Sequence, residues 1–78
     1  MNEYQVTLFA KNGKYRPVAC LVRTAEEYDL SSTADRKALI RKGTQKICIR
    51  RRWTAHDLEI YTYLTAKVRK NNESKKEV

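Results

Sequence analysis

An Asn-Gly pair between two alternating stretches constrains the fold of this chain more than any other feature. Residues 4–10 carry an apolar side chain at every second position, and residues 15–23 repeat this alternation in their second half. Alternation of this kind is typical of strands that bury one face. Asn12-Gly13 suits the two positive φ angles of a type I′ turn, so a β-hairpin is predicted. Pro17 cannot donate to a ladder, which restricts the second strand to a sheet edge or a bulge.

Helix-start signals follow the hairpin. Residues 24–27 have capping-box spacing, but the pattern is soon interrupted, so a turn or a single helical turn is expected there. Ser32 offers an N-cap and Asp35 an acid in the first turn, and good helix formers come next. Gly43 suits the position just beyond a helix end. A helix is therefore predicted over about residues 33–42.

The next stretch is compatible with two structures. Residues 45–53 alternate as a strand would, with Ile47, Ile49 and Trp53 on one side, whereas helical spacing gives a narrower apolar stripe. Thr54 then begins a capping box for a further helix. If residues 45–53 are helical, two helices joined at this junction would resemble a helix-turn-helix.

The last part of the chain favours a strand. Residues 61–69 are rich in β-branched and aromatic side chains, which favours a strand from about Thr62 onward. We expect one α+β domain over residues 1–70: an N-terminal β-hairpin, two or three short central helices and a C-terminal strand. Residues 71–78 are expected to form a flexible charged tail. The predicted core contains Val6, Leu8, Val18, Cys20, Val22, Leu39, Ile40, Ile47, Leu58 and Leu64.

A set of short motifs fills the second half of the chain: Lys46-Ile47-Cys48, Arg52-Trp53-Thr54, Asp57-Leu58, Tyr61-Thr62-Tyr63 and Lys67-Val68-Arg69. With these motifs the chain resembles a group of small proteins carried by phages and integrative elements of Gram-positive bacteria. The resemblance implies a helix around Ile47 and Cys48, because that segment is helical in proteins of this kind. It also implies a mobile element as the setting, and it implies no mechanism.

Positive charge is concentrated in one segment of seventeen residues. This segment contains eight basic residues and no acidic one: Arg36, Lys37, Arg41, Lys42, Lys46, Arg50, Arg51 and Arg52. The other nine basic residues balance the nine acidic ones, so the net charge of +8 arises from this segment. An excess confined to one segment indicates a surface that binds polyanions.

Nucleic acid is the polyanion that the residue types favour. Five of the eight basic residues are arginines, whose planar fork contacts phosphates through two hydrogen bonds. Trp53 follows directly and could stack on a base or an arginine, or pack in the core. The candidate site therefore combines the eight basic residues with Trp53, and with Lys67 and Arg69 if the last element lies beside them.

We predict a non-catalytic, nucleic-acid-binding protein with an accessory or regulatory role, in which phosphate contacts dominate. DNA is preferred to RNA because of the expected helix-turn-helix, whereas a strand at residues 45–53 would suit RNA or single strands better. The alternative is a small protein-binding module, a phage or mobile-element inhibitor or adaptor. Such a module would dock its basic face on an acidic partner protein, or add a strand at a sheet edge. The sequence does not indicate an oligomeric state.

The sequence contains few residues that would support other classes of function. His56 is the only histidine. Asp57 and Glu59 are two positions apart, so on a helix they point to different sides. An enzyme is therefore not expected. Cys20 and Cys48 are flanked by aliphatic residues and are expected to be buried, reduced thiols.

These two cysteines and one histidine do not supply a zinc site, and neither a metal nor a cofactor is expected. The first residues lack the pattern of a signal peptide, and no apolar run approaches the length of a membrane span. We therefore expect a cytoplasmic protein without a membrane partner.

Overall fold

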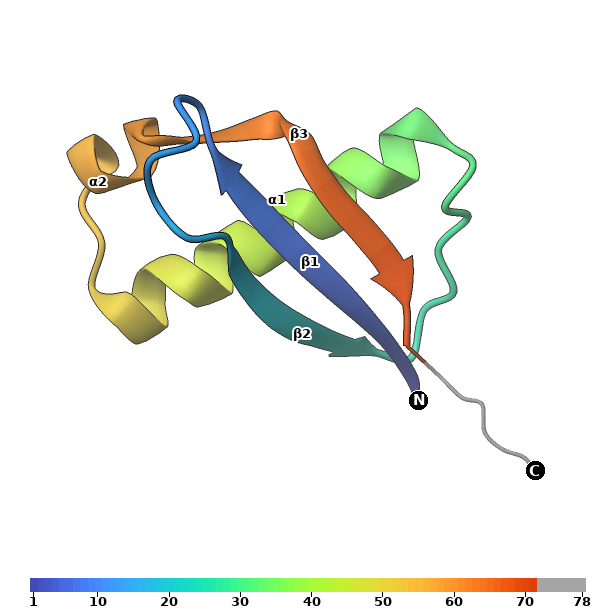
Figure 1. The fold of residues 1–78 in the computed structure, drawn as a ribbon. Helices are drawn as coiled ribbons and strands as arrows, with labels where there is room; N and C mark the ends of the chain where they lie inside the picture. Colours follow the sequence, from blue (N-terminus) through green and yellow to red (C-terminus); the bar gives the residue numbers. More distant parts are fainter. Residues whose placement is uncertain (72–78) are drawn as a thin grey trace.

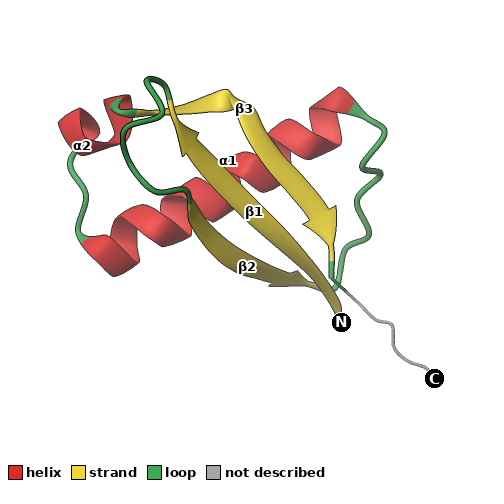
Figure 2. Ribbon diagram, viewed as in Figure 1, coloured by secondary structure: helices red, strands yellow, loops and turns green. Residues whose placement is uncertain are grey.

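The computed structural model describes residues 1–71, apart from the side chains of residues 63–65. Its elements are β1 (Asn2–Ala10), β2 (Val18–Thr24), α1 (Thr33–Arg51), α2 (Ala55–Glu59) and β3 (Tyr61–Lys70). The three strands form an antiparallel sheet in the order β2-β1-β3. Helix α1 crosses one face of this sheet, and no other described element covers the opposite face (Figures 1 and 2). The α+β class, the N-terminal strand pair and the C-terminal strand agree with the prediction.

The β1–β2 hairpin has a longer connection than predicted. The strands pair from Asn2↔Thr24 to Leu8↔Val18, so β2 begins only after Pro17. The prediction of a type I′ turn is wrong, because this turn needs two positive φ angles. Gly13 has a positive φ of 70°, but Asn12 does not. Pairing stops early because Pro17 has no backbone N–H to donate. As expected from Pro17, β2 lies at the edge of the sheet.

The core lies between α1 and the covered face of the sheet. Eight of the ten predicted core residues are buried: Val6, Leu8, Val18, Cys20, Val22, Leu39, Ile40 and Ile47. Leu58 is only half-buried, so its prediction is wrong; the short α2 contacts β3 instead of lying over the core. The side chain of Leu64 lies outside the described residues. Tyr4 was not predicted in the core, yet it is fully buried, and its hydroxyl accepts a hydrogen bond from the Tyr28 backbone N–H at 2.9 Å.

Helix α1 is much longer than the predicted helix over residues 33–42. It begins as expected, with the Ser32 hydroxyl accepting from the backbone N–H of Asp35 at 3.3 Å. It then continues through Gly43, where an added Cβ would lie 2.7 Å from the Cβ of Val6. Gly43 therefore permits a close approach between α1 and β1, and it does not end the helix. The segment around Ile47 is helix, which settles the alternative between helix and strand.

Helix α2 and strand β3 complete the fold. Thr54 and Asp57 form the predicted capping box at the start of α2, which has only five residues. The prediction of two or three short helices thus becomes one long helix and one short one, with no helix at residues 24–27. Strand β3 confirms the predicted strand, and its pairing with β1 is irregular between Thr7 and Phe9. Beyond β3, the Asn71 backbone N–H donates to the Glu3 carbonyl at 2.8 Å, and residues 72–78 of the expected tail lie outside the described residues.

Candidate nucleic-acid interface

Helix α1 places three of the predicted basic residues in one row beside β2. Lys42, Lys46 and Arg50 are four residues apart, so they lie along the same side of the helix. The Nζ atom of Lys46 donates to the backbone carbonyl of Leu21 at 2.6 Å, which shows that this side faces the outer edge of β2. We call these three residues the β2-side row.

A second row lies on the other flank of α1. Each helical residue turns by about 100°, which places Lys37 and Arg41 on roughly the opposite side of α1 from the β2-side row. Because the sheet order is β2-β1-β3, this flank faces β3, and we call the pair the β3-side row. The basic segment is therefore continuous in sequence but divided between two flanks of the helix. The buried stripe of α1 lies between these flanks.

The cations of the basic segment form no short ion pairs within the described residues. Within residues 1–71, none of the eight forms an ion pair; the three ion pairs there are Arg23–Glu3, His56–Glu59 and Lys70–Glu27. The guanidinium of Arg36 donates to two neutral acceptors, the Leu30 carbonyl at 2.7 Å and the Thr33 hydroxyl at 3.3 Å. Hydrogen bonds from Ser31 lower the pKa of Asp29, and the charge of Arg36 also contributes to this lowering.

The acidic residues of the chain lie outside the basic segment. Three of them, Glu26, Glu27 and Asp29, lie in the loop that leads from the end of β2 to the start of α1 (Figure 1). From Arg36 to Arg51, α1 has no acidic residue. Positive charge is therefore concentrated along α1 from Arg36 onward.

Two residues of the β2-side row affect the pKa of the Cys20 thiol. Burial raises the pKa of this thiol, and the positive charges of Lys46 and Arg50 oppose that rise. The thiol donates to the Gly43 carbonyl at 3.4 Å. Both cysteines are free, as predicted, but Cys48 is half-buried and only Cys20 is fully in the core.

The C-terminal end of α1 joins arginines to an aromatic stack. The Trp53 ring stacks on Tyr61, with the centroids 5.0 Å apart and the planes inclined by 20°. The guanidinium carbon of Arg51 lies 6.0 Å from the Trp53 centroid. Trp53 thus packs at the rim of the core and also contacts an arginine, and Tyr61 occupies one face of its ring. Arg52 ends the helix in the left-handed region, with φ 54° and ψ 43°.

Lys67 and Arg69 lie on the opposite side of the sheet from α1. They pair with Thr7 and Gln5 of β1, and the residue between them, Val68, packs against the core. Because side chains alternate along a strand, Lys67 and Arg69 project from the uncovered face. The structure therefore does not bring these two predicted site residues together with the rows on α1.

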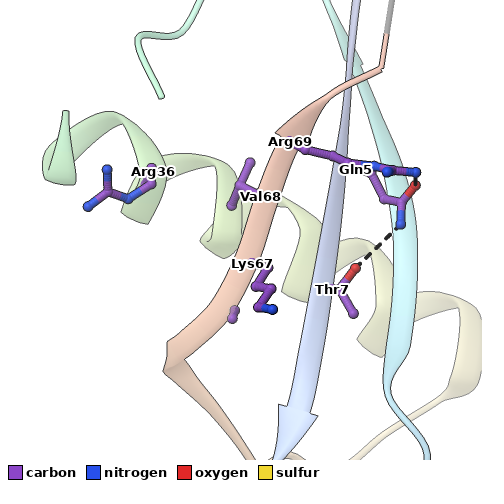
Figure 3. Close-up of a pocket in the computed structure, with 7 residues that line it drawn as sticks. Gln5, Thr7, Arg36, Lys67, Val68 and Arg69 are labelled. Atoms are coloured by element: carbon purple, nitrogen blue, oxygen red, sulfur yellow. Dashed lines mark hydrogen bonds between the residues drawn. The ribbon is translucent and has the colours of Figure 1, made fainter. Parts of the chain in front are cut away.

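On this uncovered face, Lys67 and Arg69 join a polar cluster. Arg69 Nη2 donates to Gln5 Oε1 at 3.2 Å, and Gln5 Nε2 donates to Thr7 Oγ1 at 3.5 Å (Figure 3). The ammonium of Lys67 lies 5.6 Å from the centroid of the Phe9 ring. A hollow of about 550 Å³ is lined by Gln5, Thr7, Arg36, Ala66, Lys67, Val68 and Arg69. Because Arg36 belongs to α1 and Val68 packs against the core, this hollow extends past the edge of β3 and brings Arg36, alone among the predicted residues of α1, near Lys67 and Arg69.

Gln5 and Thr7 are the site candidates that the sequence analysis missed. Their alternation with the buried Tyr4, Val6 and Leu8 already placed them together on the second face of β1. Their partners on β3 could not be inferred, because the pairing of β1 with β3 brings Lys67 and Arg69 beside them from sixty or more residues away.

Asp57 has a structural role. Its carboxylate accepts hydrogen bonds from the backbone N–H and the hydroxyl of Thr54, at 2.8 Å and 3.0 Å, which lowers its pKa. His56 is exposed and lies 3.6 Å from Glu59. In the described part of the chain, no three His, Cys, Asp or Glu side chains are grouped as metal ligands would be.

No helix within residues 1–71 is long and apolar enough to cross a membrane. Comparison with protein-family models, with curated proteins and with solved structures found no match. The side chains described above are therefore the basis for inferring a function.

Proposed function

We propose that this protein binds nucleic acid without catalysing a reaction, in an accessory or regulatory role. The observation that carries the proposal is the set of eight cations on α1 and at its end, none of which forms an ion pair within residues 1–71. The mutual repulsion of such a set is relieved when phosphates approach. Binding would depend mainly on phosphate contacts and the release of counterions.

The backbone conformation of Arg52 supports the proposal. A left-handed residue after a helix is usually glycine, because a side chain is strained there. Arg52 is the only residue other than glycine with a positive φ in the described part of the chain. Retaining an arginine at this position costs stability, which is expected where a charge is needed for binding.

Helix α2 is a poor candidate for the recognition helix of a helix-turn-helix. It has five residues, and its one histidine lies beside Glu59. We therefore assign the phosphate contacts to the β2-side row, the β3-side row and Arg51 and Arg52. The mobile-element setting implied by the motifs of the second half remains part of this proposal.

Docking on an acidic protein is the second candidate function. The observation that favours it is Ile49, which is 79% exposed on α1 and lies on the helix side between the two basic rows. A large apolar side chain among cations suits a protein partner with an apolar centre and an acidic rim.

Fluorescence anisotropy over a salt series tests the proposed function. The protein is titrated into labelled duplex DNA, single-stranded DNA and RNA of equal length. We expect micromolar or tighter binding to at least one of them, with a logarithmic salt slope that corresponds to about four to six phosphates. Absence of binding to all three at about 100 mM salt would contradict nucleic-acid binding and favour the acidic protein.

A further inference from the structure

We propose that the uncovered face of the sheet enters the major groove of B-form duplex DNA, with Gln5, Thr7, Lys67 and Arg69 at the base edges. This inference rests on the proposed function and names its ligand class. It also assigns sequence recognition to the uncovered face of the sheet, whereas the rows that contact phosphates lie on α1, on the other side of the sheet.

The charge of the uncovered face suits DNA. Its described ionisable side chains are Glu3, Arg23, Lys67 and Arg69. The only acid among them, Glu3, is held by Arg23 Nε at 3.0 Å. Among the described side chains, Lys67 and Arg69 therefore leave this face with a net positive charge.

The polar cluster on β1 and β3 has the chemistry of base recognition. An arginine fork matches the two acceptors of guanine in the major groove, and a glutamine amide matches the donor and acceptor of adenine. The 3.2 Å hydrogen bond between Arg69 and Gln5 holds both side chains on the surface in a defined orientation. The hydroxyl of Thr7 accepts a hydrogen bond from the Gln5 amide. It adds a third group of the kind that contacts base edges.

The dimensions of the two elements fit a groove with two phosphate backbones. Neighbouring strands lie about 4.8 Å apart, and the major groove, about 12 Å wide, accepts two strands. It therefore accepts the β1–β3 ribbon that carries the four side chains, with β2 continuing the sheet on the other side of β1. Helix α1 lies behind this ribbon and is about 10–12 Å across. Its β2-side and β3-side rows would then face the two backbones that border the groove. In this arrangement, the division of the basic segment between two flanks allows α1 to contact both backbones.

Single strands and RNA fit this face less well. Surfaces that bind single strands stack bases on aromatic rings, and Phe9 is the only aromatic side chain described on the uncovered face. The Lys67 ammonium already lies against that ring. The major groove of A-form RNA is too deep and narrow for side chains to read.

Selection from a pool of random duplex DNA tests the inference. The full chain is used to enrich bound duplexes, and the selection is repeated with Gln5→Ala/Arg69→Ala. The matched control is Gln45→Ala/Arg41→Ala, which removes the same two residue types from exposed positions on α1. We expect the wild type to enrich a short motif, the first variant to lose it, and the control to keep it while binding every duplex more weakly.

A second readout separates the outcomes. Protection of guanine N7 from dimethyl sulfate shows occupation of the major groove, so the wild type should protect guanines of the enriched motif. Binding without a motif, or with guanine N7 fully accessible, would overturn this inference and leave phosphate-mediated binding intact. Failure to bind any duplex, single strand or RNA would overturn the proposed function and this inference with it.

Discussion

Arg52 shows how a single residue links stability to binding in this protein. It occupies the left-handed position after α1, and its side chain extends the basic surface at the end of the helix. A glycine at that position would relieve the backbone strain and remove one charge. Stability and binding are therefore expected to change in opposite directions at this residue.

We expect Arg52→Gly to raise the free energy of unfolding by about 0.5–1 kcal/mol, because glycine takes the left-handed conformation without strain. The same variant should bind nucleic acid more weakly and lose about one unit of salt slope. Urea denaturation followed by circular dichroism measures the first change, and anisotropy measures the second. A less stable variant, or one that binds as tightly as the wild type, would show that Arg52 is not retained for binding.

Helix α1 is the element on which both the fold and the candidate site depend. Its close contact with β1 at Gly43 fixes how the helix lies on the sheet, and so determines where its two flanks point. The sequence predicted the start of this helix from Ser32 and Asp35, but the predicted helix ended at residue 42, just before Gly43. A glycine near the end of a helical pattern has two explanations, and only the position of Val6 in space distinguishes them.

We expect Gly43→Ala to lower the free energy of unfolding by about 1–3 kcal/mol, although alanine is the better helix former. The added Cβ would lie 2.7 Å from the Cβ of Val6, so the helix and β1 must move apart. Gln45→Ala, on the exposed side of α1, is the control and should change stability by less than about 0.5 kcal/mol. Thermal and urea unfolding measure both, and a stabilised Gly43→Ala would contradict the close approach.

The molecule as a whole presents two different surfaces on opposite sides of one sheet. Alternation along 4–10 predicted the buried face of β1 correctly, and the hairpin and β3 followed from residue types. The candidate site was less accessible to sequence reasoning. The division of the basic segment between two flanks depends on the helix continuing past Gly43. The cluster of Gln5 and Arg69 depends on the pairing of strands that are far apart in sequence.

The salt slope of duplex DNA binding tests the central claim most directly. It is measured for the wild type, for Lys42→Ala/Arg50→Ala in the β2-side row, and for Lys11→Ala/Lys14→Ala as a control. The control also removes two exposed cations, but from the loop between β1 and β2. We predict that the row variant lowers the slope by about two, because two phosphate contacts are lost, while the control keeps the wild-type slope. Equal slopes for the two variants would contradict the assignment of phosphate contacts to α1.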